Sequence, residues 1–337
     1  MSPRVQMRAS VLHKFGEPLR LAHVPLPNLL PGHVLVRIDS SGVNPLDTKI
    51  RIGAAAHART TLPAILGIDL AGTVEAVATD VTSFNPGDEV YGMTGGVGGV
   101  QGSLAEYAAV DARLIAVKPA SWSFKEAAAA PLAIVTAWEG LVDRAHVSTG
   151  DTVLIQGGAG GVGNVAVQLA IARGATVFAT GTAADAPVIR RFGATAIDFI
   201  TTSAEQYVHD HTGGEGFDII FDTVGGATLD ASFASVRRYT GHVVSVLGWG
   251  THSLAPLSFR GATYSGVFTL LPLLTGQDRG HHGSILRHAS ALVDEGGLTS
   301  IVDPREFTLE TVHEAHHTLE TAGNAGKVVV HISDGAR

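Results

Sequence analysis

One segment near the middle of the chain constrains the fold more than any other. Residues 152–156 (TVLIQ) form an apolar run typical of a buried strand, and the glycine-rich stretch 157–163 and a helix-forming stretch follow directly. Gly158, Gly160 and Gly163 stand at the GxGxxG spacing, which allows a tight turn, close approach of a pyrophosphate and close packing of helix on strand. The segment therefore predicts a dinucleotide-binding loop made of Gly158, Ala159, Gly160, Gly161, Val162 and Gly163.

The neighbouring sequence favours this interpretation over its alternative, a turn that is merely rich in glycine. A second strand is predicted from Ala175, so the loop belongs to a strand-helix-strand unit. The N-terminus of the intervening helix suits phosphate groups because its N–H groups are unpaired and its dipole is positive there. A second glycine cluster, residues 95–102, precedes a strand-like run without this spacing and is interpreted as a loop.

The alternation of strands and helices extends the unit into a domain. The continuous apolar runs are typical of a doubly wound parallel sheet that helices cover on both faces, and so predict an α/β fold. The strands expected in this sheet are 152–157, 175–180, 195–199, 217–222, 242–247 and 264–270.

The two ends of the chain have a different texture. From about residue 7 to residue 121, short β-branched runs are separated by Gly and Pro, which predicts an antiparallel β domain. A helix at about 284–294, a strand near Ile301 and a closing strand at 328–332 do not continue the alternation. We expect these last elements to return to the first domain.

Composition limits the partners. With 337 residues and 45% hydrophobic content the chain can fill two cores, and a net charge of -8 without any Lys/Arg run argues against nucleic acid. The absence of cysteine removes disulfides and thiolate ligands. Residues 1–18 lack the apolar core of a signal peptide, and the longest apolar stretch, 127–138, is too short to span a membrane. We expect a cytoplasmic protein that binds small molecules.

The end of the second strand bears on the choice of nucleotide. An acidic residue that binds the ribose of NAD is expected about 20 residues after the loop, near Thr180. Residues 177–182 (VFATGT) contain no carboxylate, and the next one is Asp185. Without a carboxylate a 2′-phosphate is not repelled, so NADPH is favoured over NADH, while contacts from Arg190 and Arg191 stay open. The residues assigned here are Thr180, Gly181 and Thr182.

Several further segments together resemble one family. The chain resembles the medium-chain dehydrogenases/reductases, and within them the zinc-independent quinone oxidoreductase, or zeta-crystallin-like, branch. The resemblance implies a GroES-like β-rich catalytic domain formed by residues 1–128 and 276–337, a Rossmann dinucleotide-binding domain formed by 129–275, and an active site in the cleft between them. The segments that carry it are 42–47 (GVNPLD), 67–72 (GIDLAG), 87–90 (GDEV), 157–163, 221–226 (FDTVGG) and 326–329 (GKVV).

The positions of the expected metal ligands are altered. Alcohol dehydrogenases of this superfamily hold a catalytic zinc with Cys, His and Cys, and the matching positions here are Asn44, Ile68 and Leu132. None of these side chains can play that part, and a cysteine-rich structural zinc lobe is impossible without cysteine. The resemblance therefore implies the zinc-free branch.

Two histidine groups have a spacing that can bind metal. His313, His316 and His317 stand at i, i+3 and i+4 of a predicted helix, and residues 209–211 read HDH. Solvated helix faces explain both groups, because neither is completed by a carboxylate motif or lies in a matching segment. We predict no metal.

Chemistry without zinc suits acceptors that need little electrophilic help, such as quinones and conjugated enones. Asn44 is the first candidate for a hydrogen-bond donor to the developing oxyanion, and turn formation before Pro45 is its alternative role. Lys49 stands where several relatives carry Tyr; it can stabilise the oxyanion, donate a proton, or be a solvated lysine. Asp47 can orient Lys49 or cap the following helix.

The remaining site residues come from the resemblance alone. Thr136 and Trp138 are placed near the nicotinamide and the pocket wall, although Trp138 also suits a core. Further residues that the resemblance puts at or near the nicotinamide are Val224, Leu247, Gly248 and Phe268.

Two functions of different class follow. The first is an NADPH-dependent reductase of quinones or α,β-unsaturated carbonyls, and the alternative is an NADPH-binding structural or regulatory protein with little turnover. The resemblance also suggests a homodimer formed through sheet edges, with residues 264–270 as the edge strand.

Overall fold

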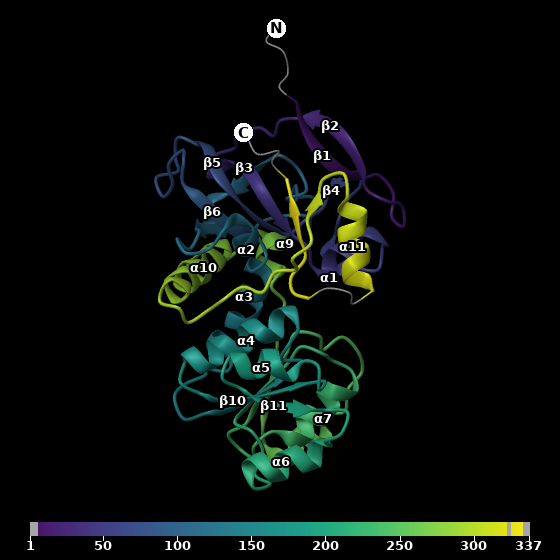
Figure 1. The fold of residues 1–337 in the computed structure, drawn as a ribbon, viewed down its shortest axis with the longest axis vertical. Helices are drawn as coiled ribbons and strands as arrows, with labels where there is room; N and C mark the ends of the chain where they lie inside the picture. Colours follow the sequence, from purple (N-terminus) through teal and green to yellow (C-terminus); the bar gives the residue numbers. More distant parts are fainter. Residues whose placement is uncertain (1–5, 322–324, 333–337) are drawn as a thin grey trace. The chain divides into compact units, whose positions relative to one another are not determined.

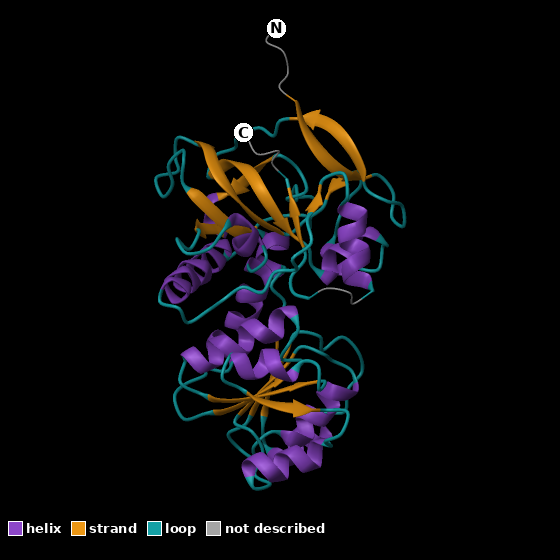
Figure 2. Cartoon of the chain, viewed as in Figure 1, coloured by secondary structure: helices purple, strands orange, loops and turns teal. Residues whose placement is uncertain are grey.

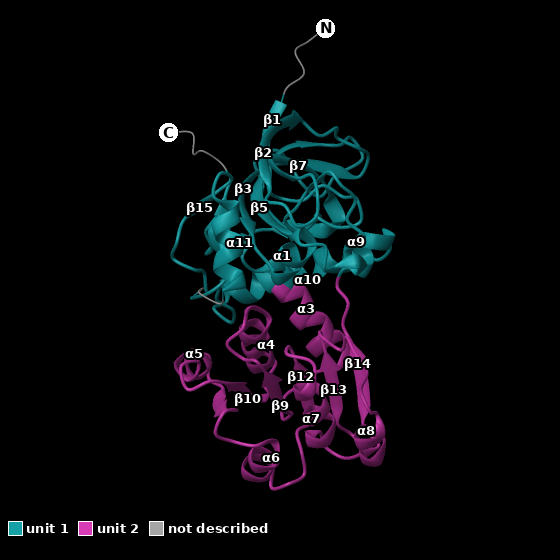
Figure 3. Ribbon diagram, turned by 90° about the vertical axis from the view of Figure 1, so that its right-hand side faces the viewer, with its two compact units in different colours: residues 1–132, 270–337 teal, residues 133–269 magenta. Residues whose placement is uncertain are grey.

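The computed structural model describes residues 6–321 and 325–332. The chain divides into two compact units, which are coloured separately in Figure 3. Unit 1 takes its residues from the ranges 1–132 and 270–337, and unit 2 consists of residues 133–269. Of the expected domain ranges, residues 1–5, 322–324 and 333–337 lie outside the described part of the chain.

Unit 2 is built on a six-stranded sheet in which every neighbouring pair is parallel, in the order β11-β10-β9-β12-β13-β14. The central strand β9 is buried on both faces because Val153, Leu154 and Ile155 are each fully buried, and helices lie on both sides of the sheet (Figure 2). This is the doubly wound architecture expected from the sequence. Its strands are β9 Thr152–Gln156, β10 Thr176–Gly181, β11 Thr195–Asp198, β12 Ile219–Asp222, β13 His242–Ser245 and β14 Thr263–Gly266.

The helices of unit 2 connect these strands. A helix that begins at the end of unit 1, α3, continues into a π-helical segment, Glu139–Arg144, which packs closely on the sheet: a Cβ at Gly140 would lie 2.2 Å from the ring of Phe221. The helices are α3 Pro131–Trp138, α4 Gly161–Ala172, α5 Ala186–Arg191, α6 Ala204–Thr212, α7 Ala227–Ser235 and α8 Ala255–Arg260.

Unit 1 is rich in β-structure. A small antiparallel sheet has the order β2-β1-β4, and a larger sheet has the order β15-β16-β3-β5-β6-β8, with β7 also paired to β3. The strands are β1 Gln6–Leu12, β2 Arg20–Pro25, β3 His33–Gly42, β4 Ala64–Ile65, β5 Asp69–Val77, β6 Glu89–Met93, β7 Tyr107–Asp111, β8 Ile115–Val117, β15 Phe307–Thr308 and β16 Val329–His331.

Segments from both parts of unit 1 share one core. Strand β16 pairs with β3 in the register Val329 to Gly42, so the C-terminal segment completes a sheet begun near the N-terminus. Helix α11 contacts α1, and the two lie together in Figure 1. The helices of unit 1 are α1 Pro45–Arg51, α2 Phe124–Ala128, α9 Leu271–Thr275, α10 Arg279–Asp294 and α11 Val312–Glu320.

Two expected strands differ from the observed ones. The strand near Ile301 is reduced to a single parallel bridge between Val302 and Lys327, because the Asp303 carboxylate accepts hydrogen bonds from the N–H groups of Arg305 and Ala325 and holds a turn there. The strand expected at 264–270 ends at Gly266, since its partner β13 ends at Ser245 and no ladder continues. Within the described ranges, none of the helices is both long and apolar enough to span a bilayer.

Candidate functional site

The glycine-rich turn joins β9 to α4 at the carboxyl edge of the sheet in unit 2. Helix α4 begins after Gly160, its N-cap residue. A Cβ at Gly163 would lie 2.0 Å from the Gly157 carbonyl oxygen, and one at Gly158 would lie 2.5 Å from the Cβ of Ala179. These two positions therefore require glycine for packing, whereas a Cβ at Gly160 would be 3.3 Å from the nearest atom outside its chain neighbours. Gly160 is thus the least crowded of the three, with one close neighbour, the Gly157 carbonyl oxygen.

Thr180 braces this turn from the end of β10. Its hydroxyl accepts a hydrogen bond from the Gly157 N–H at 3.0 Å and donates to Gln156 Oε1 at 2.8 Å, and its carbonyl accepts from the Gly158 N–H at 2.8 Å. The single hydroxyl proton is thus used inside the fold. Thr180 as a donor to a 2′-phosphate stays a prediction, and this geometry does not favour it.

A carboxylate lies beside the same strand end. Asp185 Oδ2 accepts hydrogen bonds from both the N–H and the hydroxyl of Thr182, each at 2.8 Å, and a Cβ at Gly181 would lie 2.8 Å from the Asp185 Cβ. From the sequence, Asp185 was only the next carboxylate along the chain and was given no role. The chain folds back after Thr182 and brings Asp185 to the strand end. The Thr-x-x-Asp spacing is the sequence signal that could have predicted this turn. Arg190 and Arg191 are exposed on α5.

A second buried carboxylate organises the neighbouring strand ends. Asp222, fully buried at the end of β12, accepts hydrogen bonds from the N–H groups of Val224 and Gly225 and from the Ser245 hydroxyl at 2.7 Å. The same hydroxyl accepts from the Leu247 N–H at 3.1 Å. Sequence reasoning assigned Val224 and Leu247 but missed Asp222. Its place directly after an apolar run was the signal that could have identified it.

The structure therefore collects most of the predicted cofactor residues at one edge. The carboxyl ends of β9, β10, β12 and β13 meet there because the strands are parallel, and ligands of such sheets bind at this edge. Val224 is half exposed, and Phe268 stacks edge-on against Trp249. Gly248 follows Leu247, and a Cβ there would meet the Tyr264 hydroxyl at 2.2 Å. Thr136, on α3, is buried.

The candidate catalytic residues begin in unit 1 at the start of α1. Asp47 Oδ2 accepts a hydrogen bond from the Asn44 N–H at 2.8 Å, so Asp47 caps this helix. No hydrogen bond joins Asp47 to Lys49 in the part of the chain that the structure describes, and Lys49 is exposed. The capping role of Asp47 is thus seen directly, and its action on Lys49 stays a prediction.

The Asn44 side chain lies at the centre of a buried polar cluster. Its Nδ2 donates to Asp69 Oδ2 at 2.9 Å, and its Oδ1 accepts a hydrogen bond from the Lys327 ammonium. Asp69 Oδ1 accepts from the Leu132 N–H at 2.9 Å. Asn44 and Asp47 are 1% exposed and Asp69 is fully buried. Lys327 is partly buried. We call Asn44, Asp47, Asp69 and Lys327 the buried quartet, after its three buried members.

Burial dominates the electrostatics of the quartet. It raises the pKa of Asp47 to about 7, with Asp69 adding to the rise and the Asn44 N–H opposing it. Burial also raises the pKa of Asp69 to about 6, against the attraction of Lys327. The pKa of Lys327 is lowered by burial and raised in part by the two carboxylates. The quartet thus holds two acids whose proton loss falls near neutrality.

The expected metal-ligand positions do not form a metal site. Ile68 is fully buried, Asn44 is used by the quartet, and residues 6–321 and 325–332 contain no group of three His, Cys, Asp or Glu side chains that can hold a metal. That the protein works without metal stays a prediction.

One histidine expectation was wrong. His316 is not on a solvated face: it is 1% exposed, and neither ring nitrogen has a hydrogen-bond partner. His316 lies on the face of helix α11 that also buries Val312 and Ala315. Burial lowers the pKa of His316 to about 4. His313 and His317 are exposed on the same helix.

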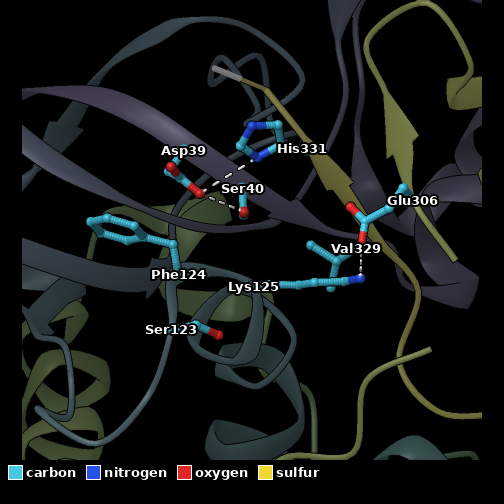
Figure 4. Close-up of a pocket in the computed structure, with 8 residues that line it drawn as sticks. All are labelled: Asp39, Ser40, Ser123, Phe124, Lys125, Glu306, Val329 and His331. Atoms are coloured by element: carbon cyan, nitrogen blue, oxygen red, sulfur yellow. Dashed lines mark hydrogen bonds and ion pairs between the residues drawn. The ribbon is translucent and has the colours of Figure 1, made fainter. Parts of the chain in front are cut away.

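Unit 1 also has a cavity of about 240 Å³ away from these residues (Figure 4). Its polar groups pair with one another: Lys125 Nζ lies 2.8 Å from Glu306 Oε1, and Asp39 Oδ1 accepts from the Ser40 hydroxyl and lies 3.7 Å from His331 Nδ1. The cavity contains none of the predicted site residues, and its lining is Asp39, Ser40, Ser123, Phe124, Lys125, Glu306, Val329 and His331.

Comparison with curated proteins finds reductases. The chain is 34% identical over 318 residues to the 2-methylene-furan-3-one reductase of Solanum lycopersicum, covering 92% of this chain and 74% of that one. It is 32% identical over 337 residues to the chloroplastic NADPH-dependent alkenal/one oxidoreductase of Arabidopsis thaliana, covering 97% and 80%.

Solved structures match the fold over nearly the whole chain. An alcohol dehydrogenase superfamily protein from Novosphingobium aromaticivorans matches with a TM-score of 0.94 and 53% identity, covering 97% of this chain and 100% of that one. The quinone oxidoreductase from Coxiella burnetii matches with a TM-score of 0.82 and 28% identity, covering 98% and 100%.

Two family models match the chain, and the second of them spans residues of both units. A model described as the alcohol dehydrogenase GroES-like domain matches residues 30–120, and one described as zinc-binding dehydrogenase matches residues 192–330. The two curated relatives are more than 30% identical to this chain over most of their length, and the β-rich unit and the parallel sheet agree with them. The chain therefore belongs to the medium-chain dehydrogenase/reductase family.

Proposed function

We propose that the protein is an NADPH-dependent reductase of quinones or α,β-unsaturated carbonyls that works without zinc. The observation that carries the proposal is the turn at residues 157–163, which opens α4 at the carboxyl edge of a parallel sheet, in a chain whose relatives are named as alkenal/one and quinone oxidoreductases. The N–H groups at the start of α4 suit a pyrophosphate. When bound, the nicotinamide supplies a hydride.

The chain's own residues have to bind the substrate oxygen and deliver a proton. Addition of a hydride to the conjugated carbon puts negative charge on the carbonyl oxygen, and one proton then completes the reduction. Asn44 is proposed as the donor to that oxygen, and the exposed Lys49 as the group that stabilises the charge or returns the proton. The assignment of Asn44 follows its match to the first zinc-ligand position of zinc-containing relatives, and that of Lys49 follows its place where several relatives carry Tyr.

The test uses the purified protein with NADPH and a panel of quinones and enones, with saturated ketones as controls, followed by the loss of nicotinamide absorbance. We expect oxidation of NADPH that requires a quinone or an enone and that persists after the protein is dialysed against a chelator. Absence of turnover with any acceptor, with NADPH binding intact, would contradict the proposal and favour a binding protein with little turnover. Loss of activity on chelation that zinc restores would contradict the zinc-free part alone.

We also propose a homodimer formed through β14, because this strand lies at the edge of the sheet in unit 2. Light scattering on the purified protein measures the assembly, and replacement of Ser265 by Pro in β14 is expected to weaken it. A monomeric mass for the unaltered protein would overturn the proposal.

A further inference from the structure

The buried quartet joins parts of the chain that are far apart in sequence. Asn44 and Lys327 are 283 residues apart, and Asn44 and Asp69 are 25 apart. Backbone hydrogen bonds fix the position from which Lys327 reaches Asn44. The Lys327 N–H donates to the Ile301 carbonyl at 2.8 Å, and the Lys327 carbonyl accepts from the Asp303 N–H at 2.9 Å. The next residue, Val328, accepts from the Val43 N–H at 2.9 Å.

This arrangement allows one orientation of the Asn44 amide. An ammonium can only donate hydrogen bonds and a carboxylate can only accept them. The amide oxygen therefore faces Lys327 and the amide nitrogen faces Asp69; the flipped amide would place N–H against N–H and oxygen against oxygen. Lys327 also donates to the Val43 carbonyl at 3.3 Å, which holds the ammonium at the residue before Asn44.

The consequence concerns what Asn44 can offer to a ligand. The amide nitrogen carries two hydrogens, and Asp69 takes one of them. The amide oxygen faces Lys327, and the ammonium takes one of its two lone pairs. One N–H remains, and it is the group that suits a carbonyl oxygen on which negative charge develops.

We propose that Lys327 is a positioning residue that acts through Asn44, holding the amide so that it presents an N–H donor and never its oxygen. This inference rests on the proposed function, in which Asn44 donates to the substrate oxygen. It makes Lys327 a determinant of turnover although it does not itself contact the substrate, and it selects substrates with an oxygen acceptor at the reacting end.

The first test is kinetic. Lys327→Met, which keeps the stem and removes the charge, is expected to lower kcat about tenfold or more and to leave the affinity for NADPH unchanged. Asn44→Ala is expected to lower kcat at least as much, and Lys327→Met added to Asn44→Ala should then have no further effect. Two losses that multiply in the double variant would overturn the proposal, because Lys327 would then act independently of Asn44.

Two variants control this test. Lys327→Arg keeps a charged donor and is expected to retain most of kcat. Lys125→Met removes a lysine of the same unit that pairs with Glu306, and it should leave kcat unchanged. If Lys327→Met does not fold, Lys327→Gln takes its place: it keeps a neutral donor, should lower kcat less than Asn44→Ala, and should be silent in that background. A loss that multiplies there also overturns the proposal.

A second readout does not need turnover. The side-chain amide of Asn44, identified by its absence in Asn44→Ala, gives two N–H signals in a nitrogen-15 NMR spectrum. We expect Lys327→Met to shift or broaden both signals and Lys327→Arg to preserve their sharpness. Unchanged signals in Lys327→Met would sink the positioning role. If no acceptor is ever reduced, the proposed function fails while this spectrum still decides the orientation of Asn44.

Discussion

The glycine-rich turn of unit 2 and the buried quartet of unit 1 differ in how they are built and in how they depend on charge. The turn is continuous in sequence, uncharged and made of backbone, and its glycines are required where a Cβ would meet Gly157 or Ala179. The quartet is assembled from three distant segments and contains two buried acids and an amine. Backbone N–H groups need no titration to attract phosphate, whereas buried charged side chains make their site sensitive to pH.

The largest expected effect breaks the turn. Gly163→Ala places a Cβ 2.0 Å from the Gly157 carbonyl oxygen, so the helix has to move away from the strand. We expect a loss of about 3 kcal/mol in the free energy of unfolding and loss of NADPH binding, measured by chemical denaturation and by titration of nucleotide fluorescence.

The matched control is Gly160→Ala, where the nearest atom is 3.3 Å away. Its stability should fall by about 1 kcal/mol, less than for Gly163→Ala, while NADPH affinity falls because the new methyl group stands where the pyrophosphate approaches. Equal destabilisation by the two substitutions would contradict the assigned division between packing and binding.

The next effect belongs to the quartet. Because the folded pKa of Asp47 is raised to about 7 from 3.8, the folded state retains a proton that the unfolded state has lost between these values. Stability from this group is therefore present at low pH and is lost as pH rises toward 7. We expect Asp47→Asn to remove on the order of 2 kcal/mol of this decline, measured as unfolding free energy at pH 5 and pH 8. A variant with the same decline as the unaltered protein would show that the proton lies elsewhere.

His316 should produce a slope of the opposite sign. Its folded pKa is lowered to about 4 from 6.5, so the unfolded state takes up a proton first as pH falls. The stability it contributes is complete above 6.5 and decreases as pH falls toward 4. His316→Leu is expected to reduce acid sensitivity in this window, by on the order of 2 kcal/mol at pH 5. His317→Leu on the exposed face is the control, and an equal effect there would contradict the burial argument.

The smallest expected effect is in unit 2. It tests the contrast between the uncharged turn and the charged quartet, because it concerns a single charge beside the turn. Asp185→Ala removes the carboxylate next to Thr182 and so removes repulsion against a 2′-phosphate. We expect the ratio of NADPH to NADH affinity to rise about threefold to tenfold. An unchanged ratio would place the specificity elsewhere, and a clear preference of the unaltered protein for NADH would overturn the proposed cofactor.

Much of unit 2 could be predicted because its signals are local. The apolar run 152–156, the glycine spacing and the alternation of strands and helices depend on neighbouring residues, and the observed strands begin within two residues of those expected. The end of the last strand was wrong: it was expected at residue 270 and lies at Gly266, because it depends on where the partner β13 ends.

The quartet could be predicted only in part. The resemblance indicated Asn44 and Asp47, and GIDLAG and GKVV were noted as segments, yet neither Asp69 nor Lys327 was given a role. The hydrogen bond from Asn44 to Asp69 depends on the pairing of β5 with β3, and the one from Lys327 to Asn44 depends on the pairing of β16 with β3. The inward turn of His316 and the return of Asp185 to the end of β10 were likewise decided by tertiary contacts.

The sequence by itself determined the two kinds of domain, the place of the nucleotide loop and the loss of the zinc-ligand side chains, because strand burial, glycine geometry and residue chemistry act over a few positions. Tertiary structure alone decided which acids are buried, which amide they hold and which carboxylate stands beside the cofactor edge. Burial and long-range hydrogen bonding change the pKa and orientation of a side chain without changing its identity, so they leave no mark in the local sequence.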